Sequence, residues 1–303
     1  SNEAGSALTA LEPCMEAIVA DRFDRPEGLR VLIAASIATQ TLPASLAAVF
    51  ETDPFVFRRW LDVASEAAPL DAFAALERAG SVVRTPGDRL LVAHTWYAIA
   101  RNGACDGADA EDNPQSRSPR DESHRCRAAL EAAAAGAMQA LREGAHAVEA
   151  RLIAAAAVAR LGRRTEAETL YREALVADPA NLVATNNLAT LLIADPDRST
   201  EALALVDDAL AEAPSHPDLL DTRALVLLSR ADADGAAAAA AAAVRARPGD
   251  AALLLTQAKT AIARRDEAMA RRLLADVVAA SSGSRGTDRR LADTARALMG
   301  ELR

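Results

Sequence analysis

Lysine is almost absent from this chain of 303 residues. The only lysine is Lys259, and every other permanently basic side chain is an arginine. A phosphate-binding P-loop needs a lysine directly after a glycine-rich turn. Lys259 instead stands in an amphipathic stretch without glycine. The sequence therefore excludes a P-loop and a protein-kinase lysine within this chain.

Cysteines and long apolar runs are also scarce. Cys14, Cys105 and Cys126 lie far apart and form no Cys-x-x-Cys pair, so we expect reduced thiols rather than a disulfide framework. The longest apolar run, Ala236–Val244, is far shorter than the roughly 20 residues of a membrane span. No signal peptide is visible, which favours a cytoplasmic protein. The sequence begins with Ser1 rather than methionine, which leaves open whether other residues precede it.

Aromatic residues make up only 3% of the chain, whereas alanine supplies 77 residues. Strands favour aromatic and β-branched residues, and alanine is the best helix former, so the composition predicts an all-α fold. The net charge of −9 argues against a nucleic-acid-binding protein, which needs a cationic surface. Abundant alanine together with arginine in place of lysine indicates a bacterial protein with a GC-rich genome.

Residues that commonly carry chemistry form no recognisable motif. The histidines are His94, His124, His146 and His216, and no two of them have the spacing of metal ligands. No Gly-x-Ser-x-Gly motif occurs, and adjacent acids such as Asp207 and Asp208 point apart on a helix. The sequence therefore predicts no catalytic residue, no metal and no cofactor, and we interpret the protein as non-enzymatic.

A pattern repeats from about residue 148 onwards. Each unit has a small residue in its first half, an alanine twelve residues later and a proline near its end. The small residues are Ala155, Thr190, Ala224 and Ala258, the alanines are Ala167, Ala202, Ala236 and Ala270, and the prolines are Pro179, Pro214 and Pro248. The prolines are separated by 35 and then 34 residues. Two amphipathic stretches joined by a polar turn predict a helical hairpin, and successive hairpins must stack to bury their apolar faces.

Residues 148–282 resemble tetratricopeptide repeats, as in the segment Ala167–Pro179, which reads AETLYREALVADP. This resemblance implies an all-α solenoid of four repeats with a right-handed superhelix. We expect capping helices in residues 123–147 and 283–303. The second helix of the third repeat is almost pure alanine, so we expect it to bury little area and to be a weak point.

The resemblance also implies where a partner would bind, because the first helices of tetratricopeptide repeats line a concave groove. Polar and apolar residues alternate there, which suits a peptide or a partner protein. The predicted groove residues are Glu149, Leu152, Arg160, Asn187, Leu191, Asp218, Asp221, Leu225, Leu255 and Lys259.

The first part of the chain has no such repeat. Residues 1–101 are predicted to be helical, apart from a β-hairpin formed by Gly80–Arg84 and Arg89–Ala93 around a Pro-Gly-Asp turn. This order makes residues 28–101 similar to the winged-helix module of signal-transduction NTPases. The competing interpretation is further helical hairpins, with Arg89–Arg101 as a helix. Residues 102–122 are polar and acidic, which predicts a flexible linker.

The sequence favours a protein-interaction scaffold that binds a protein or peptide in the concave groove. The alternative is the regulatory region of a larger signal-transduction NTPase whose ATPase core is absent from this chain. A third hypothesis, an enzyme, would need a pocket among His94, Trp96 and Tyr97. The identity of the partner and the oligomeric state stay open.

Overall fold

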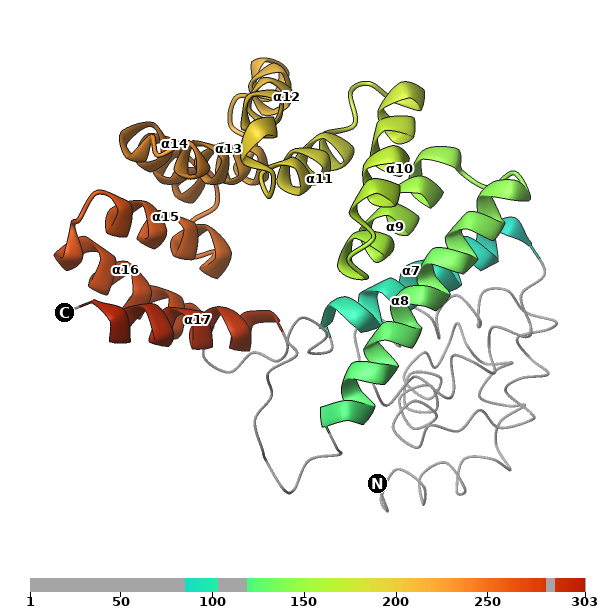
Figure 1. Cartoon of the computed structure of the whole chain (residues 1–303), viewed down its shortest axis with the longest axis horizontal. Helices are drawn as coiled ribbons and strands as arrows, with labels where there is room; N and C mark the ends of the chain where they lie inside the picture. The colour runs from blue at the N-terminus through green and yellow to red at the C-terminus, as the bar shows by residue number, and fades with distance from the viewer. Residues whose placement is uncertain (1–84, 103–118, 282–286, 303) are drawn as a thin grey trace, which may run out of the picture. The chain divides into compact units, whose positions relative to one another are not determined.

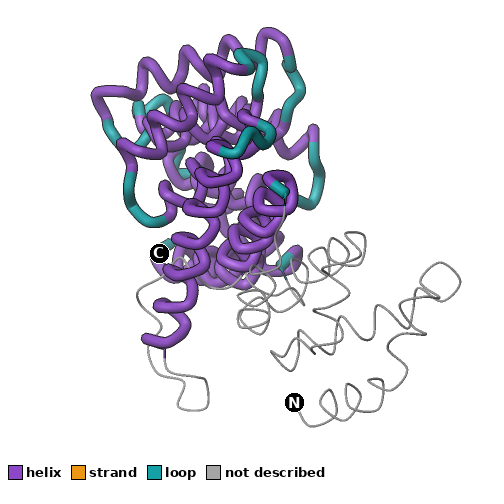
Figure 2. Tube along the Cα trace, turned by 90° about the vertical axis from the view of Figure 1, so that its right-hand side faces the viewer, coloured by secondary structure: helices purple, strands orange, loops and turns teal. Residues whose placement is uncertain are grey.

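The structure is a computed structural model that describes residues 85–102, 119–281 and 287–302. The chain divides into two compact units, residues 1–163 and 164–303, which we treat separately. Within the described ranges every regular element is a helix (Figure 2), which confirms the predicted all-α fold. None of these helices is both long enough and apolar enough to cross a bilayer.

The described part of the first unit contains three helices: α7 (Pro86–Asn102), α8 (Pro119–Arg142) and α9 (Ala147–Arg160). α8 packs against both α7 and α9. Small residues allow α7 and α8 to cross closely, since a Cβ placed on Gly136 would lie 3.2 Å from the Cβ of Ala93. Close backbone approach at Gly136 thus complements the burial of larger side chains such as Leu90, Trp96 and Leu130.

Helix α7 replaces the second half of the predicted β-hairpin. The Thr85 hydroxyl accepts a hydrogen bond from the backbone N–H of Asp88 (3.1 Å) and donates one to its carboxylate (2.6 Å). This side-chain cap by Thr85, with Pro86 in the first turn, starts a helix where we predicted a turn. The prediction of a strand at Arg89–Ala93 is therefore wrong, and the competing helix is confirmed. Residues 28–84 of the winged-helix resemblance lie outside the described residues.

Two smaller expectations for this unit also change. α8 begins at Pro119, so the predicted linker does not extend to residue 122 as a loop. Cys126, on the buried face of α8, is disulfide-bonded, so the expectation of reduced thiols is wrong for this residue. Of the residues named for the enzyme hypothesis, His94 is exposed and Trp96 is buried.

The second unit consists of eight α-helices within its described residues, with one short 3-10 turn, η2 (Pro196–Arg198). The helices are α10 (Arg164–Ala177), α11 (Leu182–Leu192), α12 (Ser199–Glu212), α13 (Pro217–Ser229), α14 (Ala233–Ala246), α15 (Ala251–Ala263), α16 (Glu267–Ala280) and α17 (Thr287–Glu301). Each helix packs against the next, and α11, α13, α15 and α17 also contact one another in order. In Figure 1, α11, α13 and α15 lie on the inner side of this unit and α12, α14 and α16 on its outer side.

Three of the four turns between the two helices of a repeat share one backbone conformation. Gly162, Ala231 and Arg265 occupy the same repeat position and have φ values of 80°, 60° and 61°. At each turn the next residue donates its N–H to a carbonyl five residues earlier, as Asp266 does to Ala261 (2.9 Å). This left-handed helix end is the Schellman motif, which glycine adopts without strain and other residues adopt at a cost.

The second repeat has a different register from the one predicted. Ala189 is fully buried and Thr190 is exposed, although we expected Thr190 to be the small residue between the helices. The second repeat is 35 residues long, one more than the third. Its extra residue is therefore accommodated after α11, where Asp195 caps the short turn η2. Because one residue rotates a helix by about 100°, this correction changes which side chains of α11 face outwards.

Alanine fills the junction between α13 and α14. The core cluster at this point consists of Ala224, Ala239 and Ala240. A pocket of about 290 Å³ opens over Ala237, Ala238 and Ala241 of α14, with Gln257 of α15 and Met269 of α16 on its other sides. The short alanine side chains of α14 leave this space unfilled, in line with the small buried area expected for this helix.

A capping helix was predicted for the end of the chain, and α17 lies there. Its buried Ala295 belongs to the same core cluster as Leu274 and Val277 of α16, and Leu291 and Leu298 pack against this cluster. Arg271 of α16 also donates a hydrogen bond to the Leu302 carbonyl. α17 thus covers the apolar face of the last repeat.

Candidate interaction surface

Half-buried and exposed side chains lie at equivalent repeat positions of the neighbouring helices α11, α13 and α15. We call this set the inner surface. Equivalent positions of the three helices contribute to it because these helices are neighbours in space. Its half-buried or exposed members are Val183, Asn186 and Thr190 of α11, Asp218, Asp221 and Leu225 of α13, and Lys259 of α15. Val183 is 56% exposed, which is unusual for a large apolar side chain of this unit.

Two polar contacts join neighbouring helices of the inner surface in the same way. The Thr222 hydroxyl of α13 donates a hydrogen bond to the side-chain oxygen of Asn186 on α11 (2.7 Å). The Thr256 hydroxyl of α15 likewise hydrogen-bonds the carboxylate of Asp221 on α13. Asn186 and Asp221 therefore occupy equivalent positions, which independently supports the corrected register of the second repeat.

Asp221 has an unusual electrostatic environment. Burial raises the pKa of its carboxyl from 3.8 to about 6, against the opposing effects of the Thr256 hydrogen bond and the Lys259 charge. The nearby carboxylates Asp250 and Asp218 add to the rise. The Oδ1 atom of Asp221 is buried and has no hydrogen-bond partner among the described residues. A charged Asp221 is thus poorly compensated in this position.

Asp218, one turn earlier on α13, has the opposite environment. Arg247, which follows α14, donates hydrogen bonds to both oxygens of the Asp218 carboxylate (2.8 and 3.1 Å). These bonds lower the pKa of Asp218. Arg247 also reaches Asp250 at 3.3 Å. Asp218 is therefore engaged within the protein at the margin of the inner surface.

Only some of the predicted groove residues belong to this surface. Asp218, Asp221, Leu225 and Lys259 do. Glu149, Leu152 and Arg160 lie on α9 in the first unit, where Glu149 is exposed and the other two are half-buried.

The remaining three predicted groove residues need correction. Asn187 and Leu191 are half-buried, and the changed register places Asn186 and Thr190, rather than these two, at the positions equivalent to Asp221 and Leu225. Leu255 is only 5% exposed and packs in the core cluster with Leu274, so its side chain is not on the surface. Sequence reasoning placed it there because an apolar residue at this repeat position can face either a partner or the next helix.

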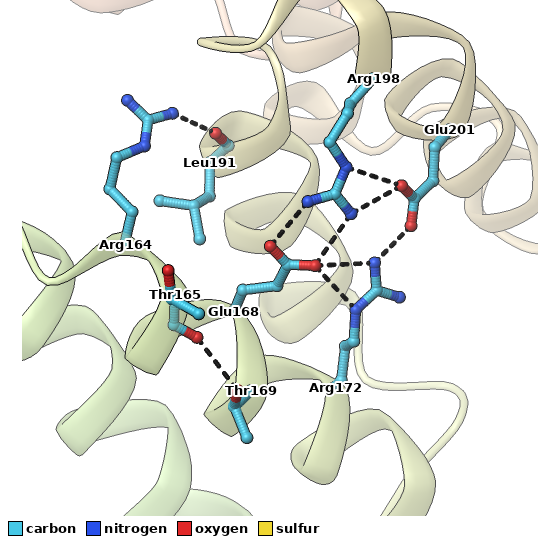
Figure 3. A network of polar contacts seen from close by, with 8 residues as sticks. All are labelled: Arg164, Thr165, Glu168, Thr169, Arg172, Leu191, Arg198 and Glu201. Carbon is cyan, nitrogen blue, oxygen red and sulfur yellow. Dashed lines mark hydrogen bonds and ion pairs between the residues drawn. The ribbon is translucent and has the colours of Figure 1, made fainter.

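The outer junctions between repeats differ strongly from one another. At the first junction, Glu168 of α10 accepts hydrogen bonds from Arg198 (2.7 and 2.8 Å) and from Arg172 (3.0 Å), as Figure 3 shows. Both arginines also contact Glu201 of α12. These hydrogen bonds lower the pKa of Glu168 to about 2, and the hydrogen bond from Arg198 contributes most. We call these four residues the ion network.

The pocket lies at the equivalent place two junctions later. Ala237 and Ala241 stand in α14 where Glu168 and Arg172 stand in α10, one and five residues after the repeated alanine. Met269 stands in α16 where Glu201 stands in α12. Charged side chains thus close the first junction, and short apolar ones leave the pocket open.

Within the described ranges, no three His, Cys, Asp or Glu side chains lie close enough together to bind a metal ion. His216 serves instead as the N-cap of α13, where its ring accepts the N–H of Leu219 at 3.4 Å.

Known structures resemble this chain although sequences do not. The sequence matches no protein-family model and no curated protein. The structure is similar to TTC0263, a thermophilic TPR (tetratricopeptide repeat) protein of Thermus thermophilus, with a TM-score of 0.51 and 18% identity. This similarity covers 56% of this chain and 90% of that one. The fold is a tetratricopeptide-repeat solenoid.

Two other solved structures have lower scores. MamA of Desulfovibrio magneticus gives a TM-score of 0.44 at 20% identity, over 55% of this chain and 95% of that one. Yeast Tom70 gives a TM-score of 0.49 at 15% identity, over 91% of this chain and 63% of that one. At such low identity the similarities concern the fold alone.

Proposed function

We propose that this chain is a protein-interaction scaffold and that its inner surface binds a segment of a partner protein. The observation that carries the proposal is the combination of an exposed apolar side chain, Val183, with polar and charged ones, Asp221 and Lys259, along three adjacent helices. Binding surfaces that accept extended peptides or partner helices commonly combine apolar contacts with a few charged groups that fix orientation.

A surface that only keeps the helices hydrated is a weaker explanation for the arrangement of Val183, Asp221 and Lys259. Val183 is 56% exposed, and among the described residues only Val176 and Met269 are comparable large apolar exceptions. A partner that covers Val183 would remove this apolar area from water. Lys259 has no ion-pair partner among the described residues within 4 Å, so its charge is available to an acidic group of a partner.

A binding experiment with matched variants tests the proposal. Val183→Asp combined with Lys259→Glu changes two side chains of the inner surface that form neither the Asn186–Thr222 nor the Asp221–Thr256 hydrogen bond. Val176→Asp is the control, because Val176 is 84% exposed on α10, outside the inner surface. The three proteins are used as bait in the native lysate, and retained proteins are quantified by mass spectrometry.

We expect a protein retained by the native chain and by Val176→Asp to be lost by the double variant. Far-ultraviolet circular dichroism of all three proteins verifies that they remain helical. A partner that binds the double variant as strongly as the native chain would contradict the assignment of the inner surface.

A further inference from the structure

The two equivalent contacts of the inner surface differ in one chemical respect. The contact between α11 and α13 uses the amide of Asn186, which does not titrate, whereas the contact between α13 and α15 uses the carboxyl of Asp221. An amide and a carboxyl have nearly the same shape, but only the carboxyl gains a charge when it loses a proton. The chain therefore contains a titratable junction and, one repeat earlier, a neutral counterpart.

The surroundings of Asp221 favour the neutral carboxyl. Its Oδ1 atom is buried without a hydrogen-bond partner among the described residues, so a charge there is incompletely solvated. On the same helix Asp218 repels that charge, and from the start of α15 Asp250 does so too. Lys259 of α15 is the attractive charge and forms no ion pair with Asp221 within 4 Å among the contacts of this unit.

Other charged groups lie on the elements packed against this junction. On α14, Asp234 pairs with Arg264 (2.9 Å) and Arg245 is exposed. Arg247, beside α14, bonds Asp218 and Asp250. α11 has no ionisable side chain at all. His216, the N-cap of α13, acts on Asp218.

α12, which also packs on α13, carries four acidic side chains. Asp207 is paired with Arg223, Glu201 belongs to the ion network, and Asp208 and Glu212 are exposed. None of them is among the groups that act on Asp221. The balance at Asp221 therefore depends on α13 and α15.

We propose that Asp221 is a protonation switch: binding of a proton to its carboxylate tightens the junction between α13 and α15 and removes one negative charge from the inner surface. The loss of one negative charge from the inner surface affects partner binding, and this part of the proposal rests on the proposed function. The effect on the junction does not, because it concerns only the packing of two helices.

The direction of the effect follows from linkage. Burial raises the pKa of Asp221 to about 6 in the folded junction, whereas an exposed Asp titrates at 3.8. Between these values the closed junction binds more protons than the opened one, so its stability falls as the pH rises. Between pH 5.0 and 7.5 these two pKa values correspond to roughly a tenfold decrease in the closing equilibrium constant.

Hydrogen exchange of the full chain measures this junction directly. Protection factors of α13 and α15 peptides are determined at pH 5.0 and 7.5, corrected for the intrinsic pH dependence of exchange. The variants are Asp221→Asn, which copies the neutral contact, and Asn186→Asp, which installs a carboxyl one repeat earlier. His216 is present in every protein, so its contribution cancels in the comparison.

The native chain is expected to lose about tenfold in α13 and α15 protection from pH 5.0 to 7.5 beyond any change in Asp221→Asn. Asn186→Asp is expected to add a similar loss in α11 and α13. The proposal is overturned if the native chain and Asp221→Asn change equally with pH, or if Asp221→Asn lowers protection by the same factor at both pH values. These outcomes are independent of the binding experiment, which can fail or succeed separately.

Discussion

The ion network should make a measurable contribution to the stability of the second unit, and Glu168 is its centre. Glu168→Gln keeps the size of the side chain but removes the charge that Arg198 and Arg172 share. The pKa of Glu168 falls from 4.5 to about 2, so the full linkage energy would be about 3 kcal/mol. The side chains of Glu168 and Arg172 are 24% and 44% exposed, and solvent screening reduces this figure to about 1–1.5 kcal/mol.

The stabilisation by Glu168 depends on pH, and the direction follows from its lowered pKa. A carboxyl whose pKa is lowered on folding stabilises the folded state fully above its unfolded pKa. For Glu168 this contribution is present at pH 7 and is lost as the pH falls from about 4.5 towards 2. The difference between the native chain and Glu168→Gln should therefore be largest at neutral pH and shrink in acid. High salt should also reduce it.

Urea unfolding followed by circular dichroism at 222 nm is a suitable assay, because the described part of the chain is helical. With a slope of about 2 kcal/mol per molar urea, the midpoint of Glu168→Gln should fall by roughly 0.5–0.8 M at pH 7. Glu166→Gln is the matched control, since Glu166 is exposed on the same helix and outside the network. Equal midpoints for the two variants at pH 7, or a difference that persists unchanged at pH 3, would refute the reasoning.

Two further substitutions should stabilise the second unit. Arg265→Gly should raise the free energy of unfolding by about 1 kcal/mol, because Arg265 has φ of 61° and glycine adopts this conformation without strain. Gly162→Ala, at φ of 80°, should lower the free energy of unfolding of the first unit, to which Gly162 belongs. Effects of the same sign in thermal unfolding would contradict this account. Ala241→Leu should fill part of the 290 Å³ pocket. Burial of roughly 40 Å² of apolar area should raise the free energy of unfolding by about 1 kcal/mol. An unchanged or lower melting temperature would mean that the pocket cannot accept the side chain.

Much of the solenoid follows from local features of the sequence. The spacing of Ala167, Ala202, Ala236 and Ala270 marks the second helix of each repeat, and each of these alanines is fully buried. Helix starts are equally local, since Asp232 and Asp266 cap α14 and α16 with their own side chains. The N-cap of α7 was also readable in Thr85, but the Pro-Gly-Asp triplet favoured a turn interpretation.

The candidate surface was less predictable because it depends on how each helix is rotated. In the second repeat the extra residue could precede or follow the small residue, and both choices preserve the spacing of the prolines. Burial of Ala189 decides this point, and with it the assignment of Asn186 instead of Asn187. Leu255 shows the same limit, because hydrophobicity alone does not distinguish a core residue from one that contacts a partner.

The sequence by itself determined that this protein is all-α, that its hairpins repeat, and where most of their turns lie. These properties follow from helix propensity, periodic small residues and capping side chains, which act within one hairpin. Only the tertiary structure decided the rotation of α11, the burial of Leu255 and the environment of Asp221. These properties depend on contacts between successive repeats, where a shift of one residue changes the face that a helix presents.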